Sequence, residues 1–65
     1  MNKQTQVEGF ERDLAAINAD YEAQKCALLA RHDGDMNPGT MMAVQILADE
    51  RRSAIELARF EWGLA

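Results

Sequence analysis

The chain has 65 residues, a formal net charge of −4 and one cysteine, Cys26. This length allows one domain whose own core is marginal, and a single cysteine excludes an internal disulfide. The acidic charge argues against nucleic acid as a partner, because phosphate backbones repel it. A chain this small needs a metal ion or other chains for stability, and we expect protein partners and no cofactor.

The N-terminal segment and the hydropathy pattern bear on where the chain works. No apolar run approaches the roughly 20 residues that span a bilayer, so no membrane span is predicted. The first six residues, Met-Asn-Lys-Gln-Thr-Gln, lack the apolar core of a signal peptide. We therefore expect a cytoplasmic protein, or one exported without a cleavable signal by a dedicated secretion apparatus.

A heptad pattern of apolar residues predicts a first helix over residues 5–31. Its members are three or four positions apart, with the polar residue Gln24 at one place in the series. Alanines between them favour helix and allow a close neighbour. Gly9 lowers the helix propensity near the start, where we expect fraying. The predicted hairpin core on this helix is Val7, Phe10, Leu14, Ile17, Tyr21 and Leu28.

Residues 33–39, Asp-Gly-Asp-Met-Asn-Pro-Gly, share with calcium-binding loops an alternation of acidic or amide side chains. An EF-hand loop requires glycine at its sixth position and glutamate at its twelfth. Counted from Asp33, these positions hold Pro38 and Val44. The bidentate ligand is missing and the proline stiffens the loop. We therefore interpret residues 32–37 as a structural turn and predict no metal site.

The same segment contains signals that end one helix and start the next. Gly34 readily adopts the left-handed conformation that stops a helix. The Asn37 side chain can cap the second helix, and Pro38 fits the first helical position, which needs no N–H partner. We predict a second helix over residues 38–62, antiparallel to the first because the connection is short.

The second helix has more apolar residues than one partner helix needs. One stripe is predicted to pack against the first helix, and its members are Met41, Val44, Ala48, Arg51, Ile55, Ala58 and Trp62. The hairpin core on this helix is then Met41, Val44, Ile55 and Trp62. A second stripe faces outward, and its large apolar members Ile46, Leu57, Phe60 and Leu64 are predicted interface residues.

These patterns predict an all-α fold: an antiparallel, coiled-coil-like two-helix hairpin that forms a single domain over residues 1–65. An exposed apolar stripe bordered by charges is typical of an interaction surface. The alternative is one wide stripe that curves around the first helix. Because a lone hairpin buries little, we expect packing with other chains to complete the fold and the protein to be oligomeric.

No residue pattern in the chain predicts an enzyme. His32 is the only histidine and Cys26 the only cysteine, and neither is accompanied by a seryl or glycine-rich motif. We interpret His32 as a C-terminal helix residue that is favourable to the helix dipole, and Cys26 as a partly buried small thiol. The charged residues 49–52 are predicted to be solvated, with Arg51 as the candidate for a buried exception.

Residues 35–45 resemble the turn of type III secretion needle and inner-rod proteins. In those small acidic helical hairpins an Asp/Asn-Pro turn is followed, two residues later, by an apolar pair and then by a glutamine. The matching residues here are Asn37, Pro38, Met41, Met42 and Gln45. The segment after Pro38 is shorter than in most needle subunits and lacks their polar C-terminal extension. Small co-chaperones of needle subunits are helical hairpins that match the length equally well.

Two functions are therefore expected. The resemblance implies a non-enzymatic component of a secretion apparatus, either a needle- or rod-like subunit or a needle co-chaperone that acts by helix packing. The alternative is a helical-hairpin homodimer, a four-helix bundle that serves as a small regulator or adaptor. In both cases the partner is protein, either the same chain or another helical one.

Overall fold

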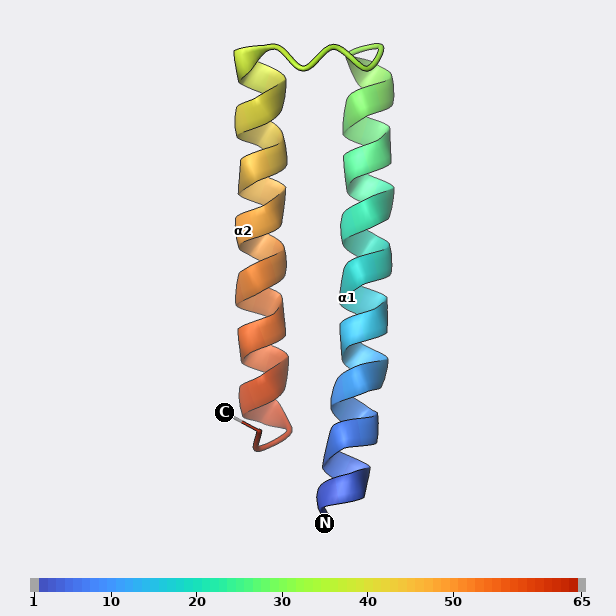
Figure 1. Cartoon of the computed structure of the whole chain (residues 1–65), viewed down its shortest axis with the longest axis vertical. Helices are drawn as coiled ribbons and strands as arrows, with labels where there is room; N and C mark the ends of the chain where they lie inside the picture. Colours follow the sequence, from blue (N-terminus) through green and yellow to red (C-terminus); the bar gives the residue numbers. More distant parts are fainter. Residues whose placement is uncertain (1, 65) are drawn as a thin grey trace.

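The computed structural model describes residues 2–64, which form two helices, α1 (Lys3–Arg31) and α2 (Pro38–Glu61). Figure 1 shows that the helices run antiparallel, with the start of α1 and the end of α2 at the same end of the hairpin. The molecule measures 46 × 16 × 10 Å. The prediction of an all-α helical hairpin is thus confirmed. Neither helix of the described chain has an apolar stretch long enough to cross a membrane.

Both helices begin with an asparagine cap three residues before a threonine. Oδ1 of Asn2 accepts a hydrogen bond from the N–H of Thr5 (2.7 Å), and Oδ1 of Asn37 accepts one from the N–H of Thr40 (2.9 Å). Pro38 is the first residue of α2. Because Asn2 satisfies a free N–H group of the first turn, α1 begins two residues before the predicted start.

The first helix ends in a left-handed turn that two residues share. Asp33 has φ +52° and Gly34 has φ +75°. Their N–H groups donate to the carbonyl oxygens of Ala30 (3.2 Å) and Leu29 (2.7 Å), the arrangement of a Schellman motif. Asp33 takes the first left-handed position, which the sequence assigned to Gly34. A non-glycine residue is uncommon there.

The second helix ends in the same motif, with Gly63 at the left-handed position (φ +72°). The N–H groups of Gly63 and Leu64 donate to the carbonyl oxygens of Phe60 (3.0 Å) and Arg59 (2.8 Å). Trp62 is the C-cap, so α2 ends one residue earlier than predicted. The turn leaves Leu64 half-buried, which corrects its assignment to an outward-facing stripe.

The face of α2 that packs against α1 is rotated toward Thr40 relative to the predicted stripe. Thr40 and Ala58 are 1% and 5% exposed, and their spacing of 18 positions equals about five helical turns, so they share one face. Met41 lies one position further around the helix and is 56% exposed, so its assignment to the core is wrong. The other predicted core residues are half-buried: Val7, Phe10, Leu14, Ile17, Tyr21, Leu28, Val44, Ile55 and Trp62.

Very little of this hairpin is fully buried. Within residues 2–64, Ala58 is the only buried hydrophobic side chain, and the other buried residues are Gly9 and Thr40. A compact protein of 7.3 kDa exposes about 4,200 Å², whereas this chain exposes 4824 Å². The two helices therefore contact each other along one edge and leave most of their apolar side chains partly in solvent.

Candidate protein-binding groove

A continuous groove runs between α1 and α2 along one face of the hairpin. It is made of three depressions in sequence, of about 340, 210 and 250 Å³ from the turn end to the terminal end. The first two share Gln24 and Leu47, and the last two share Ile17 and Ala54, so they form one surface. We refer to it as the long groove. Its lining residues are Asp13, Ala16, Ile17, Asp20, Tyr21, Gln24, Ala27, Leu28, Arg31, Ala43, Ile46, Leu47, Glu50, Arg51, Ala54, Leu57, Ala58 and Glu61.

Small side chains keep the long groove open. Ala27 on α1 and Ala43 on α2 line the section with the largest volume, at the turn end, and Ala16 and Ala54 line the terminal section. Alanine fills little of the space between two helices, so a third helix can approach closely where alanines are present. The groove therefore has the form of a seat for an elongated partner.

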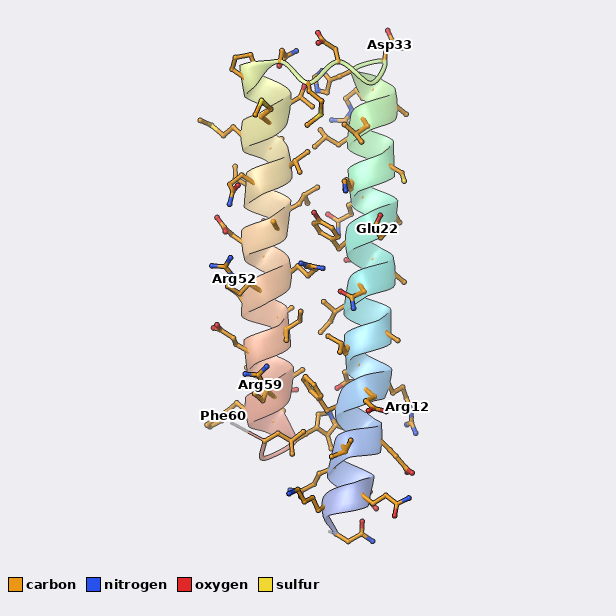
Figure 2. All side chains as sticks on the ribbon, in the orientation of Figure 1. Arg12, Glu22, Asp33, Arg52, Arg59 and Phe60 are labelled. Carbon is orange, nitrogen blue, oxygen red and sulfur yellow. The ribbon has the colours of Figure 1, made fainter. Side chains whose placement is uncertain are left out.

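The four predicted interface residues do not all lie on this groove. Ile46 and Leu57 line its turn section and terminal section and are 52% and 58% exposed. Phe60 is 73% exposed and projects away from α1 (Figure 2), outside the groove. Leu64 is half-buried in the turn after α2. The structure thus brings two of the four together with the groove, one near each end.

Carboxylates dominate the charged residues along the long groove. Asp13 and Asp20 line it from α1, and Glu50 and Glu61 line it from α2. At the turn end a single cation, Arg31, lines the groove. A partner that enters the middle and terminal sections therefore meets negative charge on both helices.

The remaining arginine of the groove is engaged across the hairpin. Nη1 of Arg51 donates to Oδ1 of Asn18 (3.3 Å), and the guanidinium carbon lies 4.7 Å from the centre of the Tyr21 ring. Such stacking on an aromatic face is favourable for arginine. The long stem spans the two helices while the residue stays exposed, so the expectation that Arg51 is a buried exception is wrong.

The opposite flank of α2 has the reverse charge. A further depression of about 230 Å³, which shares Arg51 with the middle section of the groove, is lined by Ala48, Arg51, Arg52, Ile55, Glu56 and Arg59. Figure 2 shows Arg52 and Arg59 on α2. We refer to these six residues as the arginine flank. Its one large aliphatic residue, Ile55, is half-buried, so this flank offers cations but little apolar surface.

Trp62 closes the terminal end of the hairpin. Its indole Nε1 donates to Oδ2 of Asp13 (2.7 Å). The ring lies against Gly9, where an added Cβ would be 2.5–2.6 Å from three ring carbons. The expected fraying at Gly9 is therefore wrong: Gly9 is buried, because only a residue without a side chain admits the ring. A glycine within a helical pattern is a signal for such a close approach.

The side-chain amide of Asn37 is hydrogen-bonded within the turn and the first turn of α2. Oδ1 of Asn37 accepts from both the N–H and the Oγ1 of Thr40 (2.9 and 3.2 Å), and its Nδ2 donates to Oδ2 of Asp35 (3.5 Å). Within residues 2–64, no three or more His, Cys, Asp or Glu side chains gather as a metal site would need. The cap accounts for the amide oxygen that suggested a calcium loop.

The single cysteine and the single histidine lie outside the long groove. Cys26 is exposed on α1, which corrects the expectation of a partly buried thiol. His32 is the C-cap of α1 and is also exposed. The groove itself is lined mainly by aliphatic, alanine and carboxylate side chains, with Tyr21, Gln24 and two arginines among them.

Comparison with known proteins gives no further assignment: no family model, curated protein or solved structure matches the chain. The candidate surface therefore rests on the geometry of the hairpin. That geometry is an open groove between helices, unlike the enclosed pocket with converging polar groups that is typical of small-molecule sites.

Proposed function

We propose that this chain is a non-enzymatic protein–protein interaction module that works by packing its two helices against a helix of another chain. The observation that carries this proposal is the near absence of a buried core in the described chain, where Ala58 alone among hydrophobic side chains is buried. The surface in excess of a compact protein of this mass is about 600 Å². This is of the order of the roughly 800 Å² that each partner buries in a standard interface.

Within this class, the resemblance around Asn37 and Pro38 supports a role in a type III secretion apparatus. The chain would then be a needle- or rod-like subunit, or a small co-chaperone that holds such a subunit. The capped start of α2 and the short turn supply the hairpin geometry that both roles require. The open groove is what a chaperone needs, because its client supplies the missing helix.

A second candidate is a homodimer in which two hairpins form a four-helix bundle and serve as a regulator or adaptor. The exposure of Ile46 and Leu57 on one face favours it, because a second copy could cover both residues. A bundle of this kind stops at two hairpins, whereas a filament subunit grows with concentration.

Thermal melting and solution mass over a concentration series test the proposal. We expect a low, broad melting transition for the dilute chain, which rises either with its own concentration or on addition of a helical partner. A monomer that melts cooperatively above about 60 °C at every concentration would contradict the proposal, because such a hairpin needs no partner.

Leu57→Asp and Leu14→Asp separate the interaction surface from the hairpin contact. Leu57 is 58% exposed, and surface substitutions usually change stability by no more than about 0.5 kcal/mol. Leu57→Asp should therefore leave the dilute hairpin intact and reduce the mass and stability of its assembly. Leu14 is half-buried, so Leu14→Asp should unfold the chain, since a charge there loses part of its water.

A further inference from the structure

The long groove makes two demands on whatever covers it. Ile46 and Leu57 stand half exposed near its two ends, so the occupant needs an apolar stripe along its length. Asp20 and Glu50 line the middle section from opposite helices and outnumber its one cation, Arg51. Asp13, which is bonded to Trp62, and Glu61 line the terminal section. The occupant therefore also needs positive charge on both borders of that stripe, because unpaired carboxylates at an interface are unfavourable.

A second copy of this chain supplies either the apolar stripe or the matching positive charge, but not both. In a two-fold dimer through the groove, the middle section faces the middle section of the partner, whether the hairpins run parallel or antiparallel. Two carboxylates and one arginine, Asp20, Glu50 and Arg51, would then face the same three residues, which leaves negative charge in excess on both sides. In the other arrangement the arginine flank of a second copy lies in the long groove, and its arginines face the carboxylates of the groove. The only large aliphatic residue of that flank is Ile55, which is half-buried.

We propose that the long groove binds one amphipathic helix of a different protein, whose apolar stripe is bordered on both sides by lysine or arginine. This inference rests on the proposed interaction function and names the chemistry of the partner. On α1 the groove extends from Asp13 to Arg31, about 27 Å at 1.5 Å per residue. The partner helix is therefore about 18 residues long. Its polarity is fixed by Arg31, which attracts an acidic residue or the helix C-terminus at the turn end.

The test uses two synthetic amphipathic peptides of about three heptads, each with leucine at the a and d positions. One has lysine at all e and g positions and the other has glutamate there. Like charges on both borders also keep each peptide from pairing with itself. We expect the lysine peptide to bind the full chain about tenfold more tightly than the glutamate peptide, with a preference that falls as salt is added.

Two matched charge variants locate the binding site. Asp20→Lys combined with Glu50→Lys reverses the charge of the groove at exposed positions and should abolish or reverse the peptide preference. Glu22→Lys combined with Asp49→Lys makes the same charge change on exposed residues outside the groove, and should leave the preference unchanged. Circular dichroism of each variant verifies that the hairpin is folded.

The outcomes distinguish this inference from the proposed function. Equal binding of the two peptides, or a preference that survives Asp20→Lys/Glu50→Lys, would overturn the basic-bordered helix as the partner. So would a stable dimer of the chain alone that excludes the lysine peptide, because the occupant would then be a second copy. In each of these cases the interaction function stands if Leu57→Asp weakens assembly; it fails only if the monomer is self-sufficient.

Discussion

The two ends of the hairpin are built in different ways. At the terminal end Trp62 fills the space between the helices, its ring against Gly9 and its Nε1 bonded to Asp13. At the turn end lies the section of the groove with the largest volume, about 340 Å³, whose lining includes Ala27 and Ala43. The first end is closed by one large side chain, and the second is held by backbone caps.

This difference shows how a hairpin with almost no core can still have one arrangement. The contact of Trp62 with Gly9 specifies how the helices are placed against each other, because the ring fits only where a side chain is missing. The turn end needs no such contact, since the short connection already keeps the helices together. Its apolar surface thereby remains open.

Of the substitutions that test the difference between the two ends, Gly9→Ala at the closed end should have the largest effect. In an ordinary helix this change stabilises by about 1 kcal/mol. Here the new Cβ would lie 2.5 Å from the ring of Trp62, and overpacking costs about 1–3 kcal/mol in addition to the lost ring contact. We expect a net loss of about 2 kcal/mol in the free energy of unfolding, measured by urea denaturation with Trp62 fluorescence.

The same substitution in a chain without the Trp62 ring tests the contact between Trp62 and Gly9. In a chain that already has Trp62→Ala, Gly9→Ala meets no ring and should stabilise by about 1 kcal/mol through helix propensity, measured by circular dichroism. The change of sign is the expected result. Stabilisation by Gly9→Ala in both backgrounds would show that the ring does not lie on Gly9.

At the open end, Asn37→Ala should have an effect of intermediate size. Oδ1 of Asn37 accepts two hydrogen bonds from Thr40, and loss of such a cap costs about 1 kcal/mol. We expect this loss in thermal unfolding, with the solution mass of any assembly unchanged. Asn2→Ala removes the cap at the start of α1, where one bond is made, and should cost less. An unchanged melting temperature for Asn37→Ala would disprove the role of the cap.

The sequence was sufficient for the architecture because heptad spacing and turn chemistry are local signals. The two apolar periodicities and the Asn-Pro start were enough to predict two antiparallel helices. These signals could not predict the rotation of α2 about its axis. Met41 and Thr40 are neighbours in the sequence, and which of them is buried depends on packing over the whole interface. The Asn2 cap was a readable signal that the prediction missed, since it repeats the spacing of Asn37 to Thr40.

The candidate surface was predictable only in part. Exposed apolar residues on α2 were expected, and Ile46 and Leu57 do line the groove. The groove also depends on α1, whose aspartates Asp13 and Asp20 no sequence pattern singled out. Only the relative placement of the two helices brings Asp20 and Glu50 to one surface. No spacing within a single helix contains that information.

The smallest expected effect is a gain of stability at the open end from Asp33→Gly. Asp33 holds a left-handed conformation, φ +52°, which costs a residue with a Cβ about 1 kcal/mol, and its carboxylate lies at the unfavourable negative end of the α1 dipole. Glycine removes both costs but increases the conformational entropy of the unfolded chain. The net gain in the free energy of unfolding should therefore be about 0.5 kcal/mol, measured by chemical denaturation. Asp33→Asn removes only the charge and should recover the part of the gain that comes from the helix dipole.

Gly34→Ala is the matched control, because nothing lies within 4 Å of the added Cβ and φ is +75°. This variant should lose about 1 kcal/mol through backbone conformation alone. A loss of stability in Asp33→Gly would mean that the Asp33 side chain stabilises the turn, and that the open end is held by more than its backbone caps.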